Sequence, residues 1–169
     1  ASVFSVAIIV GLTFSLLVCA GVSRWLSPWQ KERLRPYLQF YLQLFFTVLL
    51  LTSALKLVWG RVRYRQMEEA SQFCVWYLPC GVQGTSFPSG HTSSFAATVL
   101  VVLSLRFPRL RSHARLIGAA VAGSILLMML SRVIMGAHFV SDTAAGMLIA
   151  LGCWRFYDRR WEKWFYDHA

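Results

Sequence analysis

Residues 37–55 read YLQFYLQLFFTVLLLTSAL and contain no charged side chain. An α-helix needs about 20 apolar residues to cross the hydrocarbon core of a bilayer, so this run is long enough to span a membrane. Tyr37 at its start and Trp59 shortly after its end are typical of side chains that lie at the membrane interface. The run therefore predicts a transmembrane helix and indicates an integral membrane protein.

The composition of the whole chain agrees with that class. Of 169 residues, 57% are hydrophobic and only 14% are charged, which is too apolar for an ordinary soluble domain. The length leaves room for one compact bundle, so we expect a single transmembrane domain over residues 1–169. The formal net charge of +10 does not indicate nucleic-acid binding, because the basic residues stand in short clusters between apolar runs and form no single stripe.

Four further apolar runs complete the predicted bundle. The first of them carries no charge, and the other three are shorter and end in polar residues that could face the bundle interior. In chain order the predicted spans are Val3–Val22, Tyr37–Leu55, Thr92–Leu105, Leu116–Ser131 and Phe139–Trp154. We therefore expect an all-α, polytopic transmembrane helix bundle of five spans.

The basic residues predict the orientation, because loops rich in Lys and Arg stay on the cytoplasmic side. They follow the first, third and fifth spans, as an alternating topology requires: Arg24, Lys31, Arg33, Arg35, Arg106, Arg109, Arg111, Arg115, Arg155, Arg159, Arg160 and Lys163. We expect a bacterial cytoplasmic membrane, with the ends of the second and fourth spans facing the periplasm or exterior. Since the N-terminus also lies outside and the chain opens at Ala1 without Met, a longer chain is expected to begin with one more span.

Three polar segments interrupt the apolar sequence on the outward side. Ionisable groups at membrane depth are costly unless they are paired and useful. Lys56 and Arg63 stand about two helical turns apart, so both could face the same interior volume if the second span continues that far. Residues 87–91, FPSGH, then open the third span, and the free backbone amides of a helix start suit an anion.

The third segment holds a histidine and a carboxylate. His138 and Asp142 stand at i and i+4, hence on one helix face. The carboxylate can accept a hydrogen bond from one ring nitrogen and leave the other free to attack. Arg132 ends the preceding span, and the short connection 135–137 turns it back towards that histidine. Two imidazoles, three cations and a helix start would then converge, which suits a phosphoryl group: the cations neutralise its oxygens, one histidine attacks phosphorus and the other protonates the departing oxygen.

The order and spacing of these residues resemble the type 2 phosphatidic acid phosphatase superfamily of lipid phosphate phosphatases. That family shows Lys, six residues and Arg-Pro; then Pro-Ser-Gly-His; then Ser-Arg, five residues, His, three residues and Asp. The counterparts here are Lys56, Arg63, Pro88, Ser89, Gly90, His91, Ser131, Arg132, His138 and Asp142. The motifs and their helices cover residues 56–154, the expected catalytic core. Tyr64 stands where the family usually has Pro, which puts the local backbone in question more than the chemistry.

The resemblance implies a role for each of these residues. His138 would be the nucleophile that forms a phosphohistidine, and Asp142 would orient it. His91 would be the general acid for the leaving group and later the base that activates water. The phosphate would be held by Lys56, Arg63, Ser89, Gly90 and Arg132. Arg61 and Arg65 flank the first motif, either as further anion contacts or as solvated surface residues.

Metal catalysis is not expected. The chain has seven acidic residues, of which only Asp142 reaches the predicted site, and a two-metal centre needs several converging carboxylates and histidines. We therefore expect neither a metal ion nor a cofactor. An alternative for Asp142 and Arg132 is a purely structural ion pair inside the bundle.

The expected substrate is a phosphorylated lipid, and the expected partner is the bilayer itself. The active groups lie at the ends of spans, near the depth of lipid headgroups, where a tethered phosphate arrives by lateral diffusion. The sequence leaves open phosphatidic acid, phosphatidylglycerol phosphate, undecaprenyl diphosphate and a lipid A phosphate, as well as the oligomeric state. A phosphatase of a soluble ester such as a sugar phosphate, and a non-catalytic lipid-binding or transport bundle, are the alternatives; positioned histidines argue against the latter.

The outward loop before residue 86 holds two cysteines and several aromatic residues. Cys74 and Cys80 could form a disulfide in an oxidising compartment, and the sequence does not decide whether they do. The apolar residues around them could rest in the lipid interface beside the entry route, or pack over the bundle. They are Phe73, Val75, Trp76, Tyr77 and Leu78.

Overall fold

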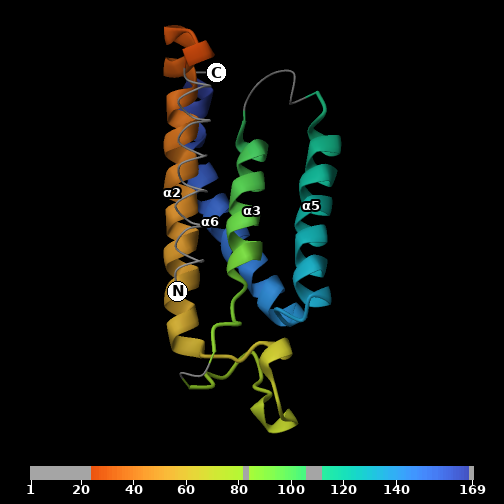
Figure 1. Cartoon of the computed structure of the whole chain (residues 1–169). Helices are drawn as coiled ribbons and strands as arrows, with labels where there is room; N and C mark the ends of the chain where they lie inside the picture. Colours follow the sequence, from red (N-terminus) through yellow and green to blue (C-terminus); the bar gives the residue numbers. More distant parts are fainter. Residues whose placement is uncertain (1–23, 82–83, 106–111, 168–169) are drawn as a thin grey trace. The chain divides into compact units, whose positions relative to one another are not determined.

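The computed structural model describes residues 24–81, 84–105 and 112–167 (Figure 1). The first predicted span, Val3–Val22, lies outside these residues. The chain comprises two compact units, residues 1–39 and 40–169, and the predicted site residues all belong to the second. The single domain expected over residues 1–169 stays a prediction.

The described residues form helices and contain no strand, which confirms the all-α class for this part of the chain. The helices are α2 (Pro28–Trp59), α3 (Gly90–Ser104), α5 (Ala114–Ile134) and α6 (Val140–Asp167), with short 3-10 turns η1 (Tyr64–Gln66) and η2 (Ala70–Gln72). They lie at the second, third, fourth and fifth predicted spans. Helix α2 starts with a capping box, because Ser27 Oγ accepts from the Gln30 amide at 3.3 Å and Gln30 Oε1 accepts from the Ser27 amide at 2.8 Å.

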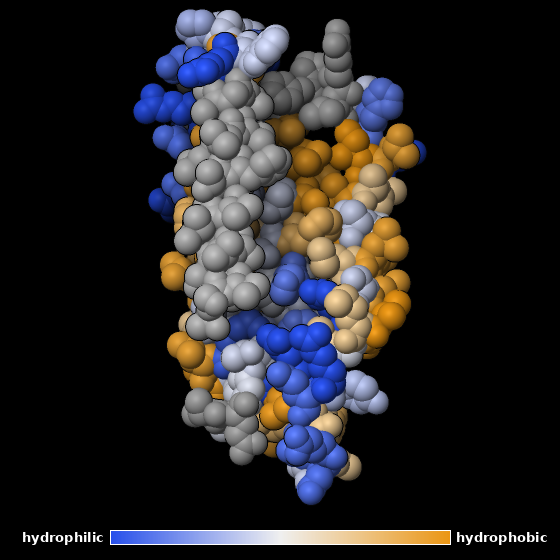
Figure 2. All heavy atoms as spheres, in the orientation of Figure 1, coloured by the Kyte–Doolittle hydropathy of each residue, from blue (hydrophilic) through white to orange (hydrophobic). Residues whose placement is uncertain are grey.

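Two of the described helices, α2 and α5, are long and apolar enough to cross a membrane, and α3 is a shorter apolar helix. Much of their apolar surface is exposed, with Leu50 on α2 and Leu127 on α5 each 69% accessible. Figure 2 shows hydrophobic residues gathered along α5. A contiguous apolar surface of this kind suits contact with lipid better than contact with water.

Helix α3 packs against both α5 and α6 within the second unit. The backbones of α6 and the start of α3 approach closely at Gly146, where an added Cβ would stand 2.6 Å from the Ser89 carbonyl oxygen. Small residues permit such contact between membrane helices. A main-chain hydrogen bond of 2.8 Å from the Ser89 amide to the Asp142 carbonyl joins the starts of the two helices. The beginnings of α3 and α6, which carry the histidine motifs, are therefore fixed to each other.

A left-handed glycine ends α2 and turns the chain towards the site. Gly60 has a φ of +61°, a conformation that favours glycine at a helix C-terminus. Beyond it, Cys74 and Cys80 form the disulfide that the sequence left open. Trp59 Nε1 donates to the Trp76 carbonyl at 2.6 Å and holds this loop to the end of α2. The Phe73 ring packs edge-on against Phe139 at 5.5 Å between centroids.

Candidate active site

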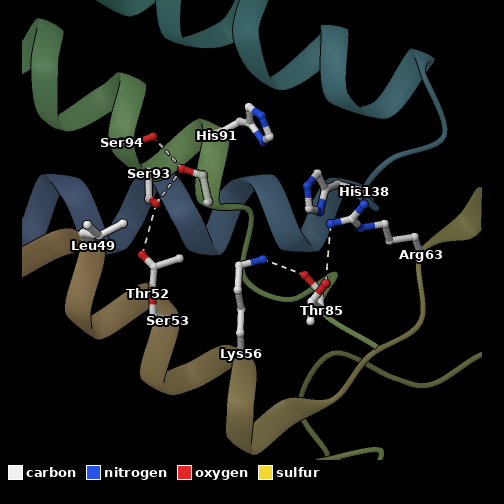
Figure 3. A pocket seen from close by; sticks show the side chains of 11 residues that line it. Leu49, Thr52, Ser53, Lys56, Arg63, Thr85, His91, Ser93, Ser94 and His138 are labelled. Carbon is white, nitrogen blue, oxygen red and sulfur yellow. Dashed lines mark hydrogen bonds between the residues drawn. The ribbon is translucent and has the colours of Figure 1, made fainter. Parts of the chain in front are cut away.

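A pocket of about 360 Å³ lies between α2, the start of α3 and the segment before α6 (Figure 3). Five of the predicted site residues line it: Lys56, Arg63, Gly90, His91 and His138. The other lining residues are Leu49, Thr52, Ser53, Thr85, Ser93 and Ser94. Residues more than 80 positions apart in the sequence, such as Lys56 and His138, therefore meet around one cavity.

The two cations of the first motif converge on Thr85. Lys56 Nζ donates to the Thr85 carbonyl at 2.5 Å, and Arg63 donates to the Thr85 hydroxyl at 3.4 Å (Figure 3). The shared volume expected for Lys56 and Arg63 is present, but not through a continuous helix, because α2 ends at Trp59. Arg63 reaches the pocket from an extended segment instead. Sequence reasoning missed Thr85, since no motif marks a residue whose main chain is the acceptor.

The two histidines reach the same pocket from different segments. His138 is 4% exposed, and its Nδ1 stands 2.8 Å from the Ser86 carbonyl oxygen. A carbonyl only accepts, so Nδ1 carries the proton and Nε2 is the nitrogen left to react. His91 is the second residue of α3, with an exposed side chain, and Figure 3 shows its ring at the same cavity. Lys56, Arg63, Arg132 and His138 all lie within electrostatic range of His91.

Asp142 is fully buried beside His138, but the two side chains are not at the hydrogen-bond distance expected. Asp142 Oδ2 lies 3.8 Å from His138 Nδ1, which is too far for a hydrogen bond. The same oxygen accepts instead from the Ser86 hydroxyl at 2.5 Å and from the Phe139 amide at 3.0 Å. The i, i+4 spacing does bring the two side chains together, but α6 begins at Val140, so His138 precedes the helix and its Nδ1 reaches the Ser86 carbonyl instead. The direct hydrogen bond is therefore corrected to an indirect link through Ser86.

Arg61 is the cation that pairs with Asp142. Its NH1 lies 2.6 Å from Asp142 Oδ1, with the two side chains 3% and 0% exposed, and it also donates to the Ser141 hydroxyl at 2.8 Å. The guanidinium stands 4.0 Å from the centroid of the Phe139 ring, a cation–π contact. Neither interpretation of Arg61 from the sequence is correct, since it neither lines the pocket nor lies at the surface. The Arg132–Asp142 pair considered as an alternative is replaced by this one.

Two predicted phosphate ligands stand outside the lining of the pocket. Ser89 is buried and caps α3, accepting from the Thr92 hydroxyl at 3.0 Å and from its amide at 3.4 Å. Arg132 ends α5 and donates to the Met135 sulfur at 2.7 Å. Within the part of the chain that the structure describes, the Nε atoms of Arg132 and Arg63, like that of Arg61, are buried without a hydrogen-bond partner. Both remain available as donors, so their role in holding phosphate stays a prediction.

The pocket is positively charged. Lys56 and Arg63 line it, while the negative charge of Asp142 is taken up by Arg61 and is not directed into the cavity. The first amides of α3 begin at Gly90, on the lining itself, and a helix start favours anions. Across the described ranges, no group of three or more His, Cys, Asp or Glu side chains is placed to hold a metal ion. The arrangement is suited to a multiply charged anion beside two imidazoles.

The chain belongs to the PAP2 superfamily, whose family model matches residues 37–165. This confirms the family that the motifs predict, and the family is one of phosphatases. Two curated relatives carry the name Lipid A 1-phosphatase: the protein of Rhizobium johnstonii is 37% identical over 114 residues, and that of Rhizobium etli is 36% identical over 114 residues. The matched segment is 66% of this chain but only 43% and 45% of those relatives, so the chain spans less than half their length. No solved structure is a significant match.

Proposed function

We propose that this chain is a membrane lipid phosphate phosphatase, which transfers phosphate from a lipid to His138 and then to water without a metal ion. The observation that carries the proposal is the state of His138: its Nδ1 is engaged by the Ser86 carbonyl, while the ring lines a pocket that also holds His91, Lys56 and Arg63. A fixed imidazole with one free nitrogen beside cations is equipped for nucleophilic attack on phosphorus.

The first chemical step forms the phosphohistidine. The Nε2 lone pair of His138 attacks phosphorus, and the bond from phosphorus to the lipid oxygen breaks with its electron pair on that oxygen. Protonated His91 gives its proton to the departing oxygen, so the lipid leaves as an alcohol, or as a phosphate from a diphosphate. Lys56, Arg63 and the amides at the start of α3 stabilise the charge on the remaining oxygens.

The second step returns the enzyme to its starting state. Neutral His91 accepts a proton from water, the water oxygen attacks phosphorus, and the electron pair of the N–P bond returns to His138. Inorganic phosphate is released and His91 is protonated again, ready for another cycle. The cations do the charge neutralisation for which other phosphatases use metal ions.

The lipid nature of the substrate is supported by the place of the pocket in the fold. The pocket lies at the end of α2 and the start of α3, and α2 and α5 have the length and composition of membrane spans. We place the chain in a bacterial cytoplasmic membrane with five spans and with the pocket on the periplasmic face. Among the four candidate lipids, the names of the two Rhizobium relatives favour a lipid A phosphate.

Phosphate release from a panel of lipids in detergent tests the proposal. The panel is dioctanoyl phosphatidic acid, phosphatidylglycerol phosphate, undecaprenyl diphosphate and lipid A. We expect His138→Ala to lose at least about 1,000-fold in turnover and His91→Ala about 100-fold or more. His113→Ala is the matched control, since His113 precedes α5, at the opposite end of that helix from Arg132, and should retain wild-type rates.

A labelled intermediate gives a second readout. Radiolabelled phosphate should remain on the wild type after an alkaline quench and be released by acid, as expected for a phosphohistidine, and His138→Ala should carry no label. Equal turnover by His138→Ala would refute the covalent mechanism. Absence of turnover on every lipid by the wild type would instead favour a bundle that only binds lipid.

A further inference from the structure

A buried network of polar side chains lies next to His138. His138 lines the pocket, whereas the residues of the network do not. The network comprises Arg61, Ser86 and Asp142, which are 2%, 0% and 0% exposed. The three residues come from the segment after α2, from the loop before α3 and from the first turn of α6. Burying two full charges together is costly unless every group is paired, so this network calls for an explanation beyond packing.

Arg61 and Ser86 are joined through both main chain and side chain. The Ser86 amide donates to the Arg61 carbonyl at 2.8 Å, and the Ser86 hydroxyl donates to Asp142 Oδ2 at 2.5 Å. The Arg61 guanidinium binds the other carboxylate oxygen, Oδ1, at 2.6 Å. These contacts close a ring in which the position of each residue depends on the other two.

This closed set of hydrogen bonds is connected to His138 Nδ1, the nitrogen whose hydrogen bond orients the imidazole. The Ser86 carbonyl, which belongs to the residue held by Arg61 and Asp142, accepts from His138 Nδ1 at 2.8 Å. Asp142 Oδ2 also accepts from the Phe139 amide at 3.0 Å, directly after His138. The carboxylate therefore fixes both the residue that binds the imidazole and the backbone that carries it.

We propose that Arg61 is a positioning residue for phosphoryl transfer: it holds the Asp142 carboxylate in place, and through Asp142 and Ser86 it fixes the ring of His138 with Nε2 towards the pocket. The inference rests on the proposed function and adds to it a residue that touches no substrate. Without the guanidinium, Asp142 is a buried carboxylate that has lost its cation, and it must rearrange or take up a proton. Either change loosens Ser86 and with it the imidazole.

Arg61→Gln tests this role, with Arg65→Gln as the matched control, because Arg65 is an exposed arginine four residues along. The substrate is the lipid of the panel that the wild type hydrolyses fastest; inorganic phosphate and orthovanadate serve as inhibitors. Inhibition by phosphate reports how well the cations bind the anion. Inhibition by vanadate also reports whether the nucleophile is aligned with the vanadium atom, because vanadate resembles the transition state. For Arg61→Gln we expect kcat to fall about 100-fold with KM within about threefold. Orthovanadate inhibition should weaken about as much as kcat, while phosphate inhibition stays within about threefold.

Two further variants keep the test decisive if Arg61→Gln does not fold. Arg61→Lys keeps the charge and a donor for Asp142 and Ser141 but loses the planar guanidinium that lies over the Phe139 ring, so it should recover about tenfold of the lost kcat. Ser86→Ala removes the hydroxyl link to Asp142 but keeps the carbonyl, and should show the same split between vanadate and phosphate.

Two outcomes would overturn the inference. A rise in KM and in the phosphate inhibition constant equal to the loss of kcat would mean that Arg61 contacts the phosphate directly. If the wild type is active and Arg61→Gln has the same kcat, the network of Arg61, Ser86 and Asp142 does not position His138. Inactivity of the wild type on every lipid would instead refute the proposed function, so the two failures are distinguishable.

Discussion

A methyl group added at Gly146 tests how closely α6 approaches the start of α3 beside the site. In Gly146→Ala the new Cβ would stand 2.6 Å from the Ser89 carbonyl oxygen, about 0.8 Å short of the 3.4 Å at which ordinary contact begins. The same Cβ would meet the Ser93 amide nitrogen at 3.4 Å. Both neighbours are backbone atoms, so no side chain can rotate away, and the start of α3 must move.

The size of the effect follows from what the start of α3 carries. The Ser89 amide is bonded to the Asp142 carbonyl at 2.8 Å, one turn of α6 before Gly146, so a shift of α3 strains that bond as well. Overpacking of this kind costs about 1–3 kcal/mol in stability. His91 follows Ser89 by two residues and moves with it, and a displacement approaching 1 Å between reacting groups costs up to about 100-fold in rate. We therefore expect turnover to fall by roughly 10–100-fold.

Phosphate release and thermal unfolding in detergent measure the two effects separately. The matched control is Gly152→Ala on the same helix, where an added Cβ meets no described atom within 4 Å. Gly152→Ala should leave turnover at the wild-type value and the unfolding midpoint at or slightly above it, because alanine inside a helix is more stable than glycine by about 0.5–1 kcal/mol. Wild-type turnover and midpoint in Gly146→Ala would refute the close packing of α3 on α6 as the support for the site.

Three further predictions concern other parts of the chain. Ser104→Ala removes hydrogen bonds to Asp158 at 2.6 Å and from Trp154 at 2.9 Å, at the end of α3 far from His91. It should lower unfolding stability by about 1–3 kcal/mol without changing kcat, and a parallel fall in kcat would contradict it. Dithiothreitol should lower the unfolding free energy by about 2 kcal/mol through the 74–80 disulfide; a double Cys→Ser variant at these positions should show no such response. Activity should persist in EDTA, and a loss that magnesium restores would contradict the mechanism without metal.

The sequence predicted the presence of the described helices better than their ends. Continuous apolar runs placed helices at residues 37–55 and 139–154, and the structure has α2 at Pro28–Trp59 and α6 at Val140–Asp167. Both errors lie in charged segments, residues 28–36 and 155–167. An apolar pattern indicates which side chains are hydrophobic, whereas the ends of a helix are set by its backbone hydrogen bonds, which continue through charged residues. The boundaries therefore could not follow from hydrophobicity alone.

For the site, the sequence predicted which side chains meet but not which backbone groups hold them. Lys56, Arg63 and both histidines line one pocket, as the spacing of the three motifs indicated. Thr85 and Ser86 were missed, although their carbonyl oxygens accept from Lys56 and His138. Every residue has a carbonyl group, so its use as an acceptor leaves no trace in residue type.

Arg61 and Arg65 show where charge could have guided the prediction further. They are the same residue type four positions apart, yet one is 2% exposed and the other lies at the surface. A carboxylate at membrane depth requires a cation, and the sequence offered only Arg132 as a possible partner for Asp142. Arg61 takes that place through its NH1 atom, while the Nε atoms of Arg61, Arg63 and Arg132 are all buried without a hydrogen-bond partner within the described chain. Since Arg61 is paired with the site's own carboxylate and Arg63 lines the pocket, we expect Arg63 and not Arg61 to meet an incoming phosphate.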